Sequence, residues 1–123
     1  CPLMIGLTAD GHQDTDFNDG VPVVTDPGAD PELSYWVAGA VSRSGADPLI
    51  FNVGLTLDQG DHHLLVGGFL AKGQINPAFG SGTGWVTSVP WAPTGVCLQP
   101  DDRMLVVGTN DSTARVIRLL TQP

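Results

Sequence analysis

Short apolar runs alternate with polar turn clusters along the whole chain. The runs are rich in Val, Ile, Leu, Phe and Trp, and Gly, Pro, Asn and Asp bound them, which is typical of strands joined by tight turns. No window places apolar residues at i, i+3, i+4 and i+7 for three turns, so we expect almost no helix. The pattern predicts nine antiparallel strands, near residues 3–8, 21–25, 35–42, 49–55, 63–70, 85–89, 94–99, 103–109 and 113–120.

One phrase occurs twice, 62 residues apart: "DGHQDTDFNDG" starts at Asp10 and "KGQINPAFGSG" starts at Lys72. The runs before it also match, 3–7 with 65–69, and 116–120 has the phase of 66–70. Between these segments, "GAVSRSGADPLIFNVGLT" parallels "GVCLQPDDRMLVVGTN". A repeat of this length indicates a solenoid or a propeller.

The repeat predicts one all-β domain over residues 1–123, with units at about 3–64 and 65–123. Strands two to five and six to nine would form two four-stranded propeller-type blades, and the strand near 3–8 would be surplus. The repeated phrase would connect neighbouring blades, with Phe17 and Phe79 filling the gap between them. A closed β-sandwich or barrel built from the same nine strands is the alternative.

Two stretches, "INPAFGSGTGWVTSV" and "GVCLQPDDRMLVVGTND", resemble the delta-60 repeat. That family's pattern places Phe-Gly, then glycines and Val, then Leu-Gln-Pro-Asp and an apolar strand ending in Gly. The matching positions here are Phe79, Gly80, Gly82, Gly84, Val86, Leu98, Gln99, Pro100, Asp101, Leu105, Val106 and Gly108. The segment "LTADGHQDTDFNDG" is similar as well, whereas "SRSGADP" departs from the pattern. The resemblance implies a secreted or surface-associated bacterial protein with β-propeller-like repeats, and it implies neither an enzymatic activity nor a ligand.

The chain is acidic, with a formal net charge of −8 from 13 acidic and 5 basic residues. Nucleic-acid binding needs concentrated positive charge, and docking on anionic lipid needs it too. The basic residues form no cluster, so we expect neither a nucleic-acid partner nor membrane insertion; they are Arg43, Lys72, Arg103, Arg115 and Arg118.

Two cysteines leave alternatives open. Cys1 could be acylated as in a mature lipoprotein, paired with Cys97 in an oxidising compartment, or free in an excised fragment. The favoured interpretation of Cys97 is a small buried apolar residue.

Weak metal and catalytic signals accompany the repeat. Asp14, Asp16, Asn18 and Asp19 offer alternating oxygen ligands suited to Ca²⁺, but the second copy of the phrase has lost nearly all of them. His62 and His63 are adjacent, so on a regular strand they would point to opposite faces. No nucleophile elbow or phosphate-binding helix start is present, so we expect no catalytic residues, no cofactor and no required metal.

The aromatic residues Tyr35, Trp36, Trp85 and Trp91 are the candidate ligand-binding residues, as stacking platforms for sugars. Trp91 lies between prolines in a predicted loop and is the best candidate for an exposed ring.

We therefore expect a non-enzymatic binding or structural module of a secreted, cell-surface or periplasmic bacterial protein. Its partners would be other copies or the remaining blades of a longer chain, with carbohydrate as a possible ligand. The alternative is a small oligomeric lectin whose propeller is assembled from several chains.

Overall fold

The computed structural model describes residues 1–27, 30–58, 60–110 and 112–120, and confirms an all-β fold. Two 3₁₀ turns, Asn18–Gly20 and Gly80–Gly82, are the helical elements of the described residues, and neither could span a bilayer. The strands are β1 (Leu3–Met4), β2 (Val23–Val24), β3 (Asp30–Ser42), β4 (Leu49–Asp58), β5 (Asp61–Leu70), β6 (Trp85–Thr87), β7 (Ala92–Leu98), β8 (Met104–Asn110) and β9 (Thr113–Leu119).

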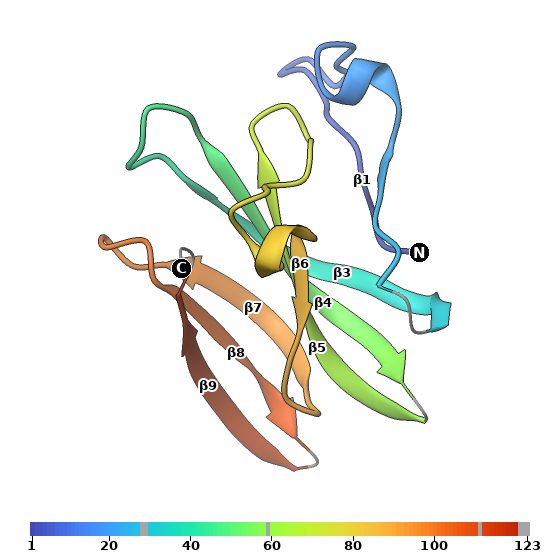
Figure 1. The fold of residues 1–123 in the computed structure, drawn as a ribbon, viewed down its shortest axis with the longest axis vertical. Helices are drawn as coiled ribbons and strands as arrows, with labels where there is room; N and C mark the ends of the chain where they lie inside the picture. Colours follow the sequence, from blue (N-terminus) through green and yellow to red (C-terminus); the bar gives the residue numbers. More distant parts are fainter. Residues whose placement is uncertain (28–29, 59, 111, 121–123) are drawn as a thin grey trace.

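These strands form three antiparallel sheets in chain order (Figure 1). We call them the first sheet (β1-β2), the central sheet (β3-β4-β5-β6) and the last sheet (β7-β8-β9). The predicted grouping of strands two to five and six to nine is wrong, because β2 pairs with β1 and β6 pairs with β5. The repeated phrase therefore returns the chain to the sheet it has just left.

The physical reason for this return lies in left-handed backbone at the 3₁₀ turns. Asp19 and Ser81 have φ of 55° and 56°, and Gly20 and Gly82 follow with φ of 77° and 94°. Consecutive residues in this region reverse the chain tightly, and glycine adopts it without steric cost. The short strand after each turn thus pairs with the edge of its own sheet, and the following strand opens the next sheet.

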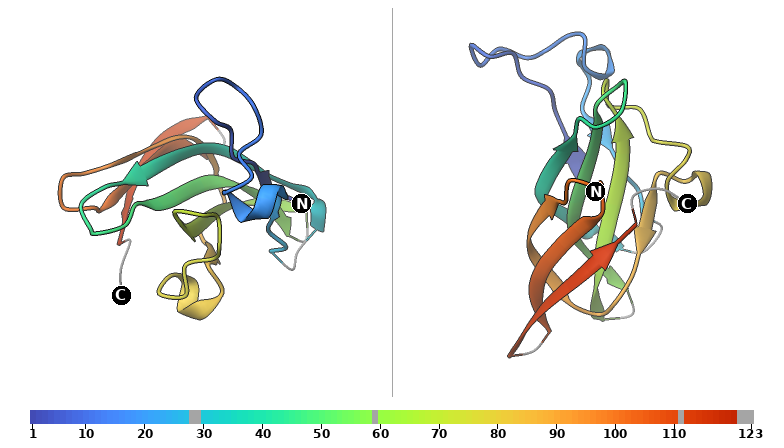
Figure 2. Two further views of the ribbon diagram at one scale, coloured as in Figure 1. Left: turned by 90° about the horizontal axis from the view of Figure 1, so that it is seen from above. Right: turned by 90° about the vertical axis from the view of Figure 1, so that its left-hand side faces the viewer.

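The central sheet uses both of its faces. On one face, β4 and β5 pack against Met104 and Val106 of the last sheet. Phe79 and Trp91 belong to the same buried cluster, and its central-sheet members are Phe51, Val53, Leu64 and Val66. Alternate residues of a strand point to opposite faces, so Asn52 lies on the other face. There the Asn52 side-chain amide contacts the sulfur of Met4 at 3.4 Å. The first sheet thus contacts one face of the central sheet and the last sheet packs on the other, and we call this arrangement the stack (Figure 2).

Both interfaces of the stack are buried, although only one of them forms the large cluster. Phe69 and Leu65 of β5 are almost fully buried on the face shared with Asn52, which contacts Met4 of the first sheet. The ring of Trp36 meets Phe69 edge-on, with centroids 6.1 Å apart. Pro2, which directly precedes β1, is also among the fully buried side chains.

The two copies of the phrase have the same backbone hydrogen bonds. Each bond of the first turn recurs in the second with donor and acceptor shifted by 62 residues. In the first turn, with the N–H donor named before the carbonyl acceptor, the bonds are Gly11–Thr8 (2.9 Å), Asp14–Gly6 (2.9 Å), Phe17–Asp14 (3.2 Å) and Gly20–Phe17 (3.0 Å). In the second turn the corresponding bonds are Gly73–Leu70 (2.9 Å), Asn76–Gly68 (3.0 Å), Phe79–Asn76 (3.0 Å) and Gly82–Phe79 (3.3 Å). The sequence repeat is therefore also a structural repeat over these turns.

Each phenylalanine of the phrase lies against a glycine of the preceding strand. A Cβ atom on Gly6 would lie 2.4 Å from the Phe17 side chain, and a Cβ atom on Gly68 would lie 2.8 Å from the Phe79 ring. Phe79 is buried, as predicted, but Phe17 is only half-buried. The first sheet has two strands where the central sheet has four, so fewer neighbours cover the Phe17 ring.

The β3–β4 and β7–β8 hairpins are also equivalent. Both strand pairs carry a bulge, between Trp36 and Ala38 in β3 and between Pro93 and Gly95 in β7. A glycine of the partner strand lies beside each bulge: a Cβ on Gly54 would approach the Tyr35 carbonyl oxygen, and a Cβ on Gly108 would approach that of Ala92. Glycine often marks such close backbone approach in strands.

The last sheet corrects the interpretation of the second cysteine. Cys97 is exposed rather than buried, and both cysteines are free in the structure. Its neighbours Val96 and Leu98 pack against the core, so the alternation of the strand directs Cys97 to the outer face of the last sheet.

A polar contact joins the tips of the two equivalent hairpins. The hydroxyl of Ser42, which is buried, donates to Asp102 Oδ1 at 2.9 Å, and the hydroxyl of the exposed Ser44 donates to Asp102 Oδ2. We expect Ser42→Ala to lower the free energy of unfolding by about 1.5–3 kcal/mol, the usual value of a hydrogen bond to a charged group. Urea denaturation measures the loss, and Ser44→Ala is the exposed control with a smaller effect. Equal effects of the two substitutions would contradict the importance of the buried bond.

Candidate functional site

An open cleft of about 620 Å³ lies where the central and last sheets meet at their hairpin ends. Three segments line it: the start of β5, the link from β6 into β7, and the end of β8. Its lining residues are Gly60, Asp61, His62, Pro90, Trp91, Ala92, Thr109 and Asn110.

Local turn chemistry places these segments together. Gly60 has φ of 86°, which allows the tight turn between the paired residues Asp58 and Asp61. The last sheet has the same kind of hairpin, with Asn110 paired to Thr113. β4 and β8 run in the same direction, so the β4–β5 turn and the β8–β9 turn lie at the same end of the molecule (Figure 1).

Trp91 forms the apolar floor of the cleft. It is only 5% exposed, which corrects the expectation of an exposed ring. Its ring lies over Gly108, where a Cβ would come within 2.3 Å of a ring carbon, so the missing side chain of Gly108 makes room for the indole. The prolines on either side suggested a surface loop, but the link passes between two packed sheets.

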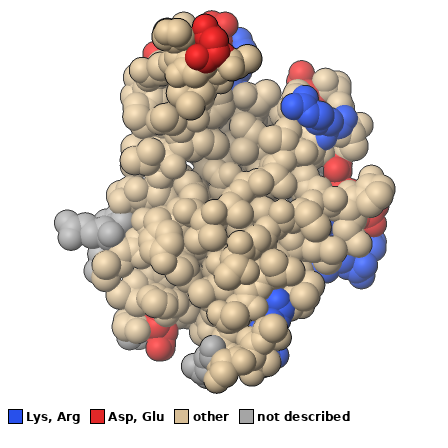
Figure 3. Space-filling model, turned by 180° about the vertical axis from the view of Figure 1, so that it is seen from behind, with Lys and Arg blue, Asp and Glu red and all other residues tan. Residues whose placement is uncertain are grey.

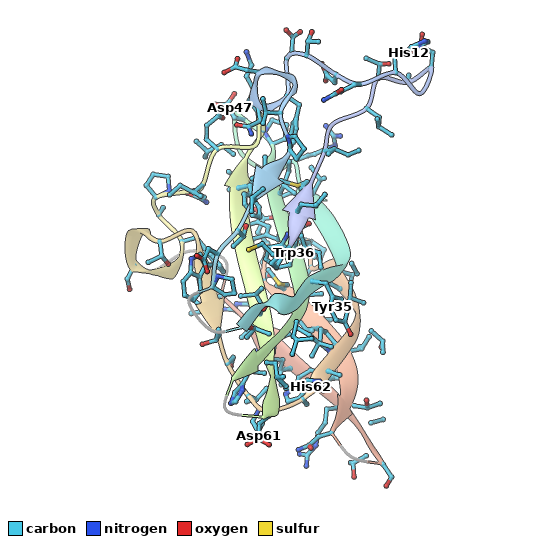
Figure 4. The ribbon with its side chains drawn as sticks, turned by 90° about the vertical axis from the view of Figure 1, so that its right-hand side faces the viewer. His12, Tyr35, Trp36, Asp47, Asp61 and His62 are labelled. Carbon is cyan, nitrogen blue, oxygen red and sulfur yellow. The ribbon has the colours of Figure 1, made fainter. Side chains whose placement is uncertain are left out.

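Polar groups surround this floor. Asp61 and His62 are exposed, and Figure 4 shows both at the tip of the β4–β5 hairpin. Thr109 and Asn110 contribute a hydroxyl and an amide from β8. A carboxylate, an imidazole, a hydroxyl and an amide around an aromatic residue can bind a small polar ligand through directed hydrogen bonds.

The other predicted aromatic residues do not line this cleft. Tyr35 is 53% exposed on β3, whereas Trp36 and Trp85 are half-buried. Trp36 packs against Phe69 and its ring N–H is buried without a hydrogen-bond partner. The structure therefore brings Trp91 together with His62 and Asp61 at the cleft, and Tyr35 is not among the lining residues. Asn110 and Thr109 were not predicted as site residues, because Thr109 ends a predicted strand and Asn110 begins the predicted turn after it.

The third histidine lies far from this cleft. Figure 4 shows His12 at the tip of the N-terminal loop, at the opposite end of the molecule from His62. His12 Nδ1 is 3.2 Å from Asp10 Oδ2, and the Thr8 hydroxyl also donates to the Asp10 carboxylate. These contacts, that of Thr8 first, lower the pKa of Asp10.

The predicted weak Ca²⁺ ligands serve the turn instead. Asp14 Oδ1 accepts the backbone N–H of Asp16 at 2.9 Å, and the Asn18 amide donates to the Val21 carbonyl at 3.0 Å. In the second copy, Asn76 Oδ1 accepts the N–H of Ala78 at 3.0 Å in the same way. Within the described ranges, no three His, Cys, Asp or Glu side chains are grouped so that they could hold a metal ion.

We expect millimolar Ca²⁺ to leave the melting temperature unchanged, because the turn forms without it in the second copy. A specific site would stabilise the folded state by about 2.7 kcal/mol at a hundred times its dissociation constant. Thermal unfolding followed by circular dichroism, with and without Ca²⁺, measures this. An increase in melting temperature that Asp14→Ala abolishes would establish a metal site.

Charged side chains lie mainly in the turns. The back of the molecule in Figure 3 shows them around its margin, with an uncharged centre. Residues 1–27 contain five aspartates and neither Lys nor Arg; the aspartates are Asp10, Asp14, Asp16, Asp19 and Asp26. The last sheet carries Arg115 and Arg118 on β9, both exposed. The two ends of the stack thus differ in charge.

No protein-family model, no curated protein and no solved structure matches the chain.

Proposed function

We propose that the chain is a non-enzymatic repeat module in which the three sheets are successive propeller-type blades. In this proposal the module has a structural or binding role in a secreted, cell-surface or periplasmic bacterial protein. One observation carries it: the central and last sheets turn equivalent faces toward the sheet that precedes each of them. The resemblance of the turns to the delta-60 repeat supports the same assignment.

The equivalence of the faces follows from strand register. Leu65 and Phe69 of β5 lie on the face of the central sheet that contacts the first sheet, and Ile117 and Leu119 of β9 point toward the central sheet. Gly54 and Gly108 mark the same register position, each beside a bulge of the first strand of its sheet. Gly54 pairs with Leu65 and Gly108 pairs with Arg115, so residues 65–69 of β5 correspond to residues 115–119 of β9. The side chains of β5 and β9 that point toward the preceding sheet therefore lie at equivalent positions.

A contact between the first and second turns also supports stacking in one direction. The N–H of Asn18 in the first turn donates to the carbonyl of Lys72 in the second turn at 2.9 Å. A Cβ on Gly73 would lie 2.9 Å from both the Phe17 ring and Val23, so the first turn rests directly on the second. Repeats that contact only their neighbours in this way can be extended by adding units.

Unit insertion tests the proposal. In a chain in which residues 30–91 occur twice in tandem, the added sheet should insert between the central and last sheets. We expect one cooperative unfolding transition with a higher m-value in urea than the parent, because m scales with the surface buried. A closed sandwich with a single core has no place for a further sheet. A second, separate transition or an unfolded insert would therefore contradict the proposal.

A carbohydrate-binding role is the second candidate, and the cleft around Trp91 is the observation that favours it. Its polar groups could hydrogen-bond sugar hydroxyls, although the Trp91 side chain is buried rather than exposed as a stacking platform. A glycan array probed with the purified chain separates the two functions. The structural role predicts no specific signal. A lectin would give a signal that Asn110→Ala abolishes and that Thr113→Ala, outside the cleft, leaves intact.

A further inference from the structure

The two outer faces of the stack carry exposed apolar side chains. The leading face is the side of the first sheet that points away from the central sheet; it consists of Leu3, Ile5, Leu7 and Val24. The trailing face is the side of the last sheet that points away from the central sheet; its exposed side chains are Cys97, Val107, Val116, Arg118 and Leu120, and Leu105 is half-buried on it. Contiguous exposed apolar surface of this kind marks a protein–protein interface.

The repeat identifies what each face is equivalent to. Leu3 and Leu7 of the leading face correspond, 62 residues on, to Leu65 and Phe69, which are buried on the face of the central sheet where Asn52 contacts Met4 of the preceding sheet. The leading face is therefore the surface that, in the central sheet, receives the sheet before it.

The trailing face is equivalent to the opposite surface. The register of β8 and β9 places Val107 at the position of Val53 and Val116 at the position of Val66. Val53 and Val66 are fully buried against the last sheet, whereas Val116 is 65% exposed. The trailing face is therefore the surface that, in the central sheet, packs on the sheet after it.

We infer that the trailing face of one copy docks on the leading face of a second copy, in the same packing that joins the sheets within the chain. The inference rests on the proposed stacking of the repeats. The contact is head-to-tail, because two different surfaces meet, and such contacts form rings or filaments. The two ends of the chain also differ in charge: residues 1–27 carry five acidic and no basic residues, whereas the exposed Arg118 lies on the trailing face.

Complementation between two blocked variants tests the inference. Val116→Glu places a charge on the trailing face, and Leu3→Glu places one on the leading face; both side chains are more than half exposed, so folding should survive. We expect light scattering after size exclusion to show wild-type species above the monomer mass of 12.8 kDa, increasing with concentration. Each variant alone should be a monomer. A 1:1 mixture should give a dimer, because one intact leading face and one intact trailing face remain.

Leu33→Glu is the matched control, since Leu33 is half exposed on the central sheet and lies on neither outer face. It should assemble as the wild type does, and circular dichroism should show that all variants are folded. A monomeric wild type would overturn the inference, and so would a variant that still dimerises alone. Neither result would affect the unit-insertion experiment, which tests the stacking itself.

Discussion

Replacing Phe79 by Ala is expected to lower the free energy of unfolding by about 3–5 kcal/mol, the usual cost of truncating a buried phenylalanine. The ring is 7% exposed and meets Phe51 edge-on, with centroids 5.7 Å apart. It fills the space between the central and last sheets, so its loss leaves a cavity that the strands cannot close. Urea denaturation at two wavelengths measures the change.

Phe17→Ala is the matched control, because Phe17 has the same position in the repeat but is only half-buried. We expect about half the loss of the Phe79 variant, in proportion to the apolar area removed from water. A loss below about 1 kcal/mol for Phe79→Ala would show that the ring is not part of a packed interface.

Substituting Gly54 by Val is expected to destabilise the fold by about 3 kcal/mol, the upper end of the cost of overpacking. A Cβ at this position would lie 2.0 Å from the Tyr35 carbonyl oxygen and 2.8 Å from the Trp36 Cα. Both are backbone atoms of the bulged strand, so no side-chain rotation can relieve the clash. Thermal and urea unfolding of the variant measure the effect.

Gly95→Ala provides the control for Gly54→Val. A Cβ on Gly95 would contact only a Val107 methyl group at 3.3 Å, and the register of the bulges gives Ala38 the equivalent place in β3. We expect a change within about 0.5 kcal/mol, as for ordinary substitutions away from special sites. A large loss for Gly95→Ala, or none for Gly54→Val, would contradict the role assigned to the bulge.

Sequence periodicity predicted the all-β fold and the equivalence of the two turns, because both depend on local chemistry. The glycines and the phenylalanine that build the turn are visible as letters at fixed spacing. The pairing of β2 with β1 and of β6 with β5 was predicted wrongly. A reversal at Gly20 or Gly82 is equally compatible with a strand that opens the next sheet, and only the left-handed residues before them decide its direction.

The site was harder to predict than the fold. Trp91 has prolines on both sides, which suggests a loop, yet the packing of two sheets buries it over Gly108. Cys97 follows an apolar residue and precedes another, which suggests a core position. Its exposure depends on which face of β7 meets the central sheet. Both properties arise from contacts between sheets, which the pattern along a single strand does not contain.

Through-hydrogen-bond scalar couplings in a long-range HNCO spectrum test the stacked repeat most directly. Stacking predicts one cross-peak from the Asp14 amide to the Gly6 carbonyl and another from the Asn76 amide to the Gly68 carbonyl, which are the same bond in the two turns. It also predicts a cross-peak from the Asn18 amide to the Lys72 carbonyl, which joins the first turn to the second. A spectrum that contains the Asn76 peak but neither the Asp14 nor the Asn18 peak would contradict both the repeat and the stacking.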